Sequence, residues 1–386
     1  MENSPPRQKQ AADHSPSPNE KQMALDIPDA DKPSLPSEST KLQGLFKQLS
    51  VLDRYLYVWI FVVMVISILF GYYVKGVKKA FQVAEIASVS LPIAIGLWVM
   101  MYPVLCKVQY EILGQVLRQA GSGKTVTISI VLNWIIGPAL MTGLAWATLP
   151  DLSEFRTGVI LVGIARCIAM VLIWNDLAKG DADYCAVLVA INSVLQIILF
   201  TPVALFYLKV VSRGKGFHVS SWTVAKSVLL FLGVPLVAGI VTRFVLMSAF
   251  GRRWYQRKFL SFIGPWALIG LLYTIFVMFS IQAHQIVDSI GHVVRVAVPL
   301  LLYFGAVFFG SLFLCKWLKV PYPLAVTQCF TAASNNFELA IAVAVGSFGI
   351  DSKEALAATI GPLIEVPVLL LFVYVVGFFQ KKWPVA

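Results

Sequence analysis

Residues 163–181 read GIARCIAMVLIWNDLAKGD, an apolar run that carries an arginine, Arg166, and a cysteine, Cys167, near its centre. An ionisable side chain is costly inside a segment apolar enough to enter a bilayer, and it marks a functional site by default. The rest of the chain agrees with a membrane setting, because 58% of residues are hydrophobic, 13% are charged and the mean hydropathy is +0.77. This composition predicts a polytopic membrane protein with the lipid bilayer as its solvent.

The net charge of +11 does not indicate nucleic-acid binding. The lysines and arginines occur in short clusters between apolar runs, which is the pattern of loops on the cytosolic side of a membrane. The five cysteines are odd in number, show no Cys-x-x-Cys spacing, and lie in or beside apolar runs: Cys106, Cys167, Cys185, Cys315 and Cys329. We therefore expect no nucleic-acid partner, no disulfide framework, no zinc site and no cofactor.

The N-terminal region belongs to another class of sequence. Residues 1–45 are rich in proline, serine and charged residues and almost lack aliphatic clusters, so they cannot bury enough surface to fold. We predict a disordered cytosolic tail there. Residues 46–54 continue a helical pattern of leucines opposite charged residues, which predicts an amphipathic lead-in at the membrane surface.

From Tyr55 onward, apolar runs of about 20 residues, the length of a membrane-spanning helix, alternate with short charged loops. This spacing predicts ten transmembrane helices over residues 55–74, 85–106, 125–147, 155–177, 184–208, 223–248, 259–280, 293–316, 322–347 and 354–379. They form two five-helix repeats, 55–208 and 223–379, with a linker at 209–222 and a cytosolic C-terminus at 380–386. Alternate loops carry 15 basic residues on the N-terminal side and nine on the other, so both termini are predicted to be cytosolic.

The two halves align when the sequence is shifted by 169 residues. The informative pairs are Arg166 with Asn335, Cys167 with Asn336, and Gln196 with Glu365. Repeats with an odd number of spans are related by inverted topology. The polar interruptions at the centres of spans 4 and 9 predict two discontinuous helices that cross near the midplane, where transporter sites are built. The predicted fold is therefore an all-α membrane protein of two inverted five-helix repeats.

Span 9 contains SNNFELAIAVAV at residues 334–345, in which serine and asparagine disfavour a helix interior. Asn335, followed three residues later by Glu338, resembles a capping box, so a half-helix is expected to start at Asn335. Glu338 then either satisfies backbone donors or, as an ionisable group at this depth, carries a proton. Glu365, between Pro362 and Pro367, lies in a similar setting in span 10.

The sequence leaves two interpretations open for the residue pair in span 4. A free cysteine is usually a small apolar filler, and we keep that interpretation for the other four cysteines. Beside the Arg166 cation, Cys167 is favoured as a thiolate, the form that binds soft metals and metalloids. Alternatively, Arg166 pairs with Glu338 or Glu365 in a structural ion pair; the two roles are compatible.

Three stretches carry a family resemblance: GIARCIAMVLIWNDLAKGD, NWIIGPALM at 133–141, and SNNFELAIAVAV. They resemble the arsenite permeases of the arsenical-resistance family, within the bile acid, arsenite and riboflavin transporter superfamily, over about residues 50–380. The resemblance implies a transporter, not an enzyme, that exports arsenite, and in some members antimonite, in exchange for protons. It also implies ten spans in inverted repeats with spans 4 and 9 broken. The length of the tail favours a eukaryotic, fungal-like member.

Carried over residue by residue, the essential cysteine of the family falls on Cys167, the expected arsenic or antimony ligand, and its essential acid falls on Glu338. The full expected substrate-binding set is Cys167, Arg166, Asn335, Asn336, Trp174 and Asn192, with Glu338 and Glu365 coupling the proton. The expected location is the plasma membrane, with the vacuolar membrane as the alternative. The alternative function is sodium-coupled symport of an organic anion of the bile-acid type on the same fold.

Overall fold

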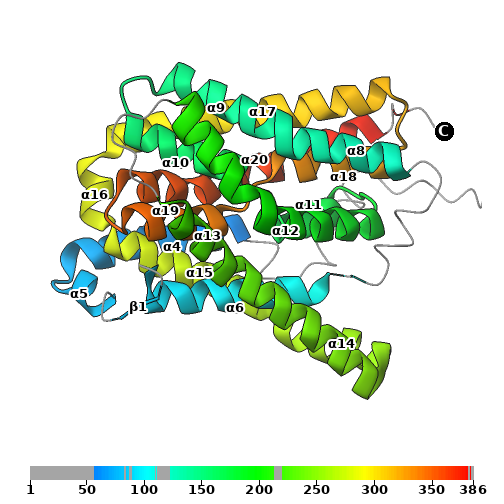
Figure 1. Cartoon of the computed structure of the whole chain (residues 1–386), viewed down its shortest axis with the longest axis horizontal. Coiled ribbons are helices and arrows are strands. Elements are labelled where there is room, and N and C mark those ends of the chain that lie inside the picture. The colour runs from blue at the N-terminus through cyan, green and yellow to red at the C-terminus, as the bar shows by residue number, and fades with distance from the viewer. Residues whose placement is uncertain are drawn as a thin grey trace, which may run out of the picture. The chain divides into compact units, whose positions relative to one another are not determined.

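The computed structural model describes residues 56–81, 84–86, 89–108, 110, 122–212, 220–380 and 383. All of them belong to one compact unit, Val51–Ala386 (Figure 1). The tail predicted at 1–45 and the lead-in predicted at 46–54 lie outside the described residues. So do residues 213–219 of the predicted linker and most of the C-terminal segment.

The described part of the chain is almost entirely helical. Its first half contains α4 (Leu56–Tyr73), α5 (Val77–Phe81), α6 (Leu91–Lys107), α8 (Ser122–Val131), η2 (Leu132–Ile136), α9 (Gly137–Thr148), α10 (Ser153–Ile164), α11 (Met170–Leu177), α12 (Ala182–Leu205) and η3 (Phe206–Val211). Its second half contains α13 (Ser221–Val228), η4 (Leu229–Gly233), α14 (Val234–Trp254), η5 (Tyr255–Phe259), α15 (Leu260–Ile281), α16 (Ala283–Asp288), α17 (Ile290–Trp317), α18 (Tyr322–Ala333), α19 (Phe337–Phe348) and α20 (Lys353–Gln380). The η elements are π-helical turns that continue the neighbouring α-helices.

Five continuous helical stretches of the described chain are long and apolar enough to cross a membrane: Gly123–Thr148, Ala182–Val211, Ser221–Ile281, Ile290–Trp317 and Lys353–Gln380. The stretch Ser221–Ile281 is interrupted at Gly251, whose φ of +80° is not helical. It therefore contains two of the predicted spans. Val58–Tyr73, Leu91–Lys107 and Phe337–Phe348 are shorter apolar helices. The helices follow the apolar runs that the sequence predicts.

The start of the predicted span 85–106 is not helical. Glu85–Ile86 (β1) and Val89–Ser90 (β2) pair as antiparallel strands, with Glu85 opposite Ser90. Helix α6 begins only at Leu91 and carries a proline in its first turn. Proline fits there because the first N–H groups of a helix have no intrahelical partner. The expectation of a helix from residue 85 is wrong for the two strands, Glu85–Ile86 and Val89–Ser90.

The two spans predicted to be broken are each divided in the structure. The first consists of α10 and α11, with the last helical residue at Ile164 and the next at Met170. The second consists of α18 and α19, separated by residues 334–336. Helix α20 packs along α10 and α19, while α17 packs against α18 and α12 contacts α11 and α18. The two interruptions are therefore enclosed by helices on several sides.

Candidate functional site

The two interruptions face each other and bond through their backbones. Arg166 and Asn335 form an isolated antiparallel β-bridge. The backbone N–H of Asn336 donates to the carbonyl of Ala165 at 3.1 Å, and Asn335 Nδ2 donates to the carbonyl of Val162 at 2.6 Å. A helix that stops inside a protein leaves backbone groups without partners. Here each broken helix supplies hydrogen-bond partners to the other. We call the two hydrogen-bonded segments, 165–169 and 334–336, the crossing.

Helix α19 is capped by Asn336. Its Oδ1 accepts a hydrogen bond from the backbone N–H of Leu339 at 3.0 Å, and Glu338 lies in the first helical turn. The expected cap at Asn335 is therefore wrong, because the backbone and side chain of Asn335 are engaged with the first broken helix. The N-terminus of α19, with its partial positive charge, points into the crossing.

Arg166 is fully buried, and its guanidinium binds the C-terminal end of α10. The guanidinium donates to the carbonyls of Gly163 and Ile164 and, through Nη1, to the hydroxyl of Tyr303 at 3.0 Å. A cation is favourable beside the carbonyls of a helix C-terminus. A Cβ atom at Gly137 would lie 2.7 Å from Nη1, so this glycine of the NWIIGPALM stretch leaves room for the guanidinium.

These contacts include neither of the partners that the sequence suggests for the Arg166 guanidinium. Among the described residues, Arg166 forms no ion pair, so the expected pairing with Glu338 or Glu365 is not made. None of its hydrogen bonds within the described chain goes to Cys167 either. Successive side chains of an extended segment point to opposite sides, which separates the guanidinium from the thiol. The Arg166 guanidinium therefore satisfies carbonyls at the end of α10, directly before Cys167 in the sequence.

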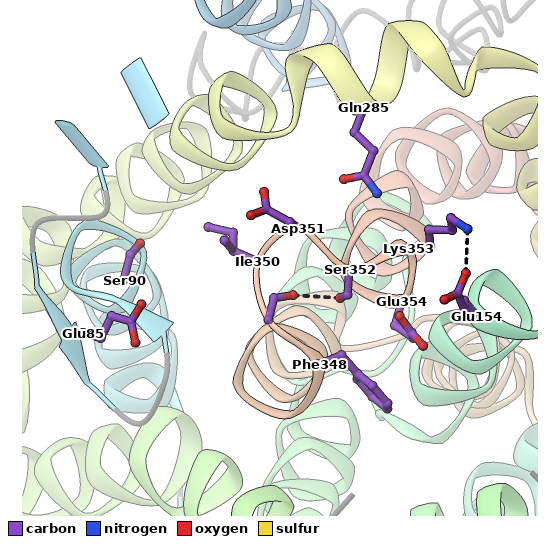
Figure 2. A pocket seen from close by; sticks show the side chains of 11 residues that line it. Glu85, Ser90, Glu154, Gln285, Phe348, Ile350, Asp351, Ser352, Lys353 and Glu354 are labelled. Atoms are coloured by element: carbon purple, nitrogen blue, oxygen red, sulfur yellow. Dashed lines mark hydrogen bonds and ion pairs between the residues drawn. The ribbon is translucent and has the colours of Figure 1, made fainter. Parts of the chain in front are cut away.

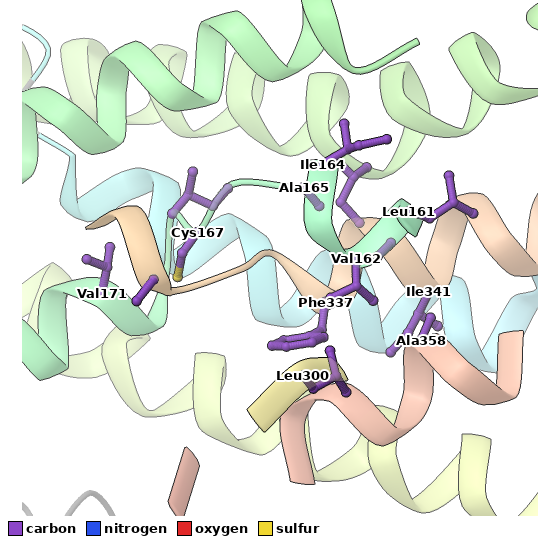
Figure 3. Packing of buried hydrophobic residues seen from close by; sticks show 14 of the residues in the cluster. Leu161, Val162, Ile164, Ala165, Cys167, Val171, Leu300, Phe337, Ile341 and Ala358 are labelled. Atoms are coloured by element: carbon purple, nitrogen blue, oxygen red, sulfur yellow. The ribbon is translucent and has the colours of Figure 1, made fainter. Parts of the chain in front are cut away.

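Cys167 is 1% exposed, and its sulfur points towards the extended segment between α18 and α19 (Figure 3). The thiol interacts there with Ser334 and lies within the electrostatic influence of Glu365 and Glu338. The hydroxyl of Ser334 donates to Glu365 Oε1. Both carboxylates are buried, Glu338 at 8% exposure and Glu365 at 2%. Cys167 and Glu365 therefore interact with the same serine, and Glu338 lies buried in the first turn of the helix that follows it.

Several buried polar atoms around this site have no hydrogen-bond partner within the described chain: Asn335 Oδ1, Asn336 Nδ2, Gln196 Nε2, Asn192 Nδ2 and Trp174 Nε1. Leaving such an atom unsatisfied costs about 1–3 kcal/mol, so these atoms suit a polar ligand. Asn192 Oδ1 accepts from Trp134 Nε1 at 3.1 Å. Trp174 lies on α11 and Asn192 on α12, beside the crossing rather than within its hydrogen-bonded core.

Three contributors were absent from the predicted set. Ser334 directly precedes the two asparagines, so its place in the same interruption was a usable signal. Gln196 accepts from the backbone N–H of Arg166 at 3.0 Å, and its isolation as a polar residue within an apolar span was also visible. Tyr303 holds the Arg166 guanidinium from α17, and nothing in the sequence pattern points to that contact.

Comparison with known proteins identifies the family. Residues 94–289 match the sodium bile acid symporter family. The arsenical-resistance protein Acr3 of Corynebacterium glutamicum is 47% identical over 351 residues, which cover 90% of this chain and 94% of that protein. The chain is an Acr3-type member of the sodium bile acid symporter family.

Two further relatives are similar over most of the chain, and one of them is also an Acr3 protein. The arsenical-resistance protein Acr3 of Alkaliphilus metalliredigens is 32% identical over 348 residues, covering 88% of this chain and 96% of that protein. An uncharacterized transporter of Synechocystis is 34% identical over 344 residues, covering 84% of this chain and 88% of that protein. This Acr3-type chain is therefore a multi-pass membrane transporter and not an enzyme, as the sequence predicts.

Proposed function

We propose that this Acr3-type chain is a secondary active transporter that exports arsenite in exchange for protons, with antimonite as a second substrate. The observation that carries the proposal is the buried site in which Cys167 shares its surroundings with Glu338 and Glu365. The arsenical-resistance relatives support arsenite as the cargo.

The chemistry of arsenite suits this donor set. Arsenous acid is uncharged at neutral pH, so the membrane voltage alone cannot expel it and uphill export needs an exchanged ion. Trivalent arsenic prefers sulfur, yet three thiolates would bind it too firmly for release. Among the described residues, no group of three or more His, Cys, Asp or Glu side chains could hold a metal ion. A single thiol gives selectivity and still permits release.

We assign each side chain a role on this basis. The Cys167 thiol displaces one hydroxyl of arsenous acid, whose departure with the thiol proton yields one water, and hydration reverses the step on release. The unpaired amide atoms of Asn335 and Asn336 bind the remaining hydroxyls. Glu338 and Glu365 take up and release the exchanged proton. Trp174 and Asn192 line the path from neighbouring helices.

We also propose ten spans in two inverted repeats, with both termini in the cytosol and the protein in the plasma membrane. The offset of 169 residues carries α10, Ser153–Ile164, onto 322–333, the limits of α18. It carries 122–148, the stretch from α8 to α9, onto 291–317, within one residue of α17 at its start. The β-bridge supports the same relation, because it joins two residues that this offset makes equivalent.

The function is tested with everted membrane vesicles that contain the full chain. An acidic lumen should drive arsenite uptake, and antimonite uptake in parallel, whether or not sodium is present. The family name gives specific weight to the alternative, a sodium-coupled organic-anion symporter. Uptake of an organic anion that requires sodium, with no proton-driven movement of arsenite, would establish that alternative instead.

A further inference from the structure

A cavity of about 750 Å³ lies at the end of the protein that the proposed topology places outside the cell (Figure 2). Its walls are the segment 348–352 with the start of α20, the start of α10, the β-hairpin and α16. Glu354 lines this cavity and is only 7% exposed. The cavity does not include Cys167, so it is separate from the buried site described above.

Glu354 forms no ion pair in the described chain, although Lys353 beside it carries the opposite charge. The charged groups that line the cavity with it are Glu154, Lys353, Asp351 and Glu85. Lys353 Nζ pairs with Glu154 at 2.7 Å, and Asp351 pairs with Lys78, also at 2.7 Å. Glu85 projects from β1 on the opposite wall and is exposed. A buried carboxyl group whose neighbouring cations are already paired is suited to binding a proton.

The opposite wall presents an independent polar group to the same cavity. Ser90, at the end of β2, is 4% exposed, and its hydroxyl has no hydrogen-bond partner within the described chain. It lines the cavity with Glu354. The hydroxyl can bind water or a hydronium ion that enters between the two walls. The cavity therefore holds both a proton acceptor and a site for the proton donor.

Helix α20 connects this cavity to the buried site. Glu354 and Glu365 are 11 residues apart on α20, which is about three turns, so both lie on one face about 16 Å apart along the axis. Pro362 lies between them and has no N–H, so the carbonyl of Ala358 lacks its helical donor. Ala358 lies one turn from Glu354 on the same face. This free carbonyl can accept a hydrogen bond from a water molecule on the face that joins the two carboxyl groups.

The ring of Phe337 covers the same face of α20. A Cβ atom at Gly361 would collide with Phe337 Cε1 and Cδ1. Gly361 lies two turns beyond Glu354 and one turn before Glu365, on the line that joins them. Figure 3 shows Phe337 beside the crossing that carries Cys167. The ring therefore lies on the line between the two carboxyl groups.

We propose that Glu354 is the proton-loading group on the outer side of the exchanger. A hydronium ion in the cavity gives its proton to the Glu354 carboxylate and leaves as water. When Phe337 moves aside, water enters between the two carboxyl groups. The Glu354 carboxyl gives its proton to this water chain, which delivers a proton to the Glu365 carboxylate, and Glu354 is left as a carboxylate. This inference rests on the proposed exchange of arsenite for protons.

The test measures arsenite uptake by everted vesicles in which only the lumen pH is varied, because the lumen corresponds to the outside of the cell. In Glu354→Gln, uptake should fall about tenfold or more at a neutral lumen pH and recover as the lumen is acidified. Arsenite self-exchange at equal pH requires no net proton movement and should be unchanged. Glu354→Asp restores a carboxyl group and should restore the wild-type lumen-pH profile.

The matched control is Glu85→Gln, which removes the same charge from the opposite wall and should leave the profile unchanged. If the wild type lacks proton-driven uptake, the proposed function fails and the proton-loading role fails with it. If the wild type is proton-driven and Glu354→Gln keeps its lumen-pH profile, only the role of Glu354 is overturned. The role is also overturned if Glu85→Gln gives the same shift, or if Glu354→Gln and Glu354→Asp both lose self-exchange.

Discussion

The thiol of Cys167 permits a test of ligand chemistry against packing at a single residue. Cys167→Ser changes the side-chain volume little, so a filler cysteine should tolerate it at a cost near 1 kcal/mol. A protonated hydroxyl is a poor ligand for trivalent arsenic. We expect the variant to reach the membrane at normal abundance and to lose both arsenite and antimonite uptake in vesicles.

The other four cysteines provide the controls for this substitution. All are buried, as Cys167 is, so serine in their place tests the packing cost alone. Single serine variants at these positions should remain active: Cys106, Cys185, Cys315 and Cys329. Near wild-type arsenite uptake by Cys167→Ser would mean that oxygen and nitrogen groups bind the metalloid without sulfur.

A substitution at Glu338 tests proton coupling separately from arsenite binding. Glu338→Gln keeps the shape of the side chain in the first turn of α19 but removes the carboxyl group that we propose exchanges a proton. Uptake driven by an acidic lumen should collapse, while arsenite binding to the purified protein largely survives. The cap of α19 is made by Asn336, so the helix start should persist in the variant. Undiminished proton-driven uptake would remove Glu338 from the proton path.

At the scale of the secondary-structure elements, the contact between α19 and α20 depends on a glycine. Gly361→Ala forces the new methyl group against the ring of Phe337 and should destabilise the protein by about 1–3 kcal/mol. Gly377 lies on the same helix with nothing within 4 Å of its Cβ position. Gly377→Ala should therefore be neutral or stabilise by up to about 1 kcal/mol. Thermal unfolding of the two detergent-solubilised variants measures both changes in stability. Equal melting temperatures would contradict the close contact between Gly361 and Phe337.

The sequence is a good guide to these elements because membrane-spanning helices need long apolar runs and polar residues interrupt them. That pattern places α12, α17 and α20 and both interrupted helices. It misses the pairing of β1 with β2, because the sequence around these strands is apolar enough to continue a span and strand pairing is not visible in that pattern.

The contacts of the candidate site depend on where the backbone runs and the side chains point, which the sequence does not show. From the sequence alone, the two consecutive asparagines are equally good helix caps. The path of the backbone makes Asn336 the cap of α19 and places Asn335 in the β-bridge with Arg166. The sequence likewise shows that Arg166 is buried in an apolar run without showing that its acceptors are Gly163, Ile164 and Tyr303. Contacts between distant helices are set by packing angles rather than by local pattern.

At the scale of the whole molecule, an exposed ion pair ties the loop before α10 to α17. Arg295 donates to both carboxylate oxygens of Asp151, at 2.5 and 2.8 Å, and this contact lowers the pKa of Asp151 to about 2. Because the pKa of Asp151 in the folded protein lies below its ordinary value, the ion pair contributes its full stabilisation at any pH above that ordinary pKa. The stabilisation is lost as the pH falls through about 2.

Asp151→Asn should therefore lower the melting temperature slightly at neutral pH, and the difference from the wild type should shrink as the solution is acidified. The difference should also shrink at high salt, because both partners are exposed. Asp288→Asn is the control, since Asp288 is an exposed residue of α16 that belongs to no ion pair among the described residues. A salt-independent effect of Asp151→Asn would indicate a change in packing instead.

The β-bridge between Arg166 and Asn335 has a consequence for the direction of transport. In the proposed inverted repeat, a position that bonds to its own counterpart lies on the rotation axis that interchanges the two halves. A cargo bound beside it meets the same thiol of Cys167 and the same amide of Asn336, whichever compartment it comes from. The same groups then bind cargo in both directions of the proposed exchange. Because that exchange trades uncharged arsenous acid for a proton, its net direction should follow the arsenite and proton concentrations on the two sides together with the membrane voltage, and reversing the proton gradient and the voltage should turn export into import.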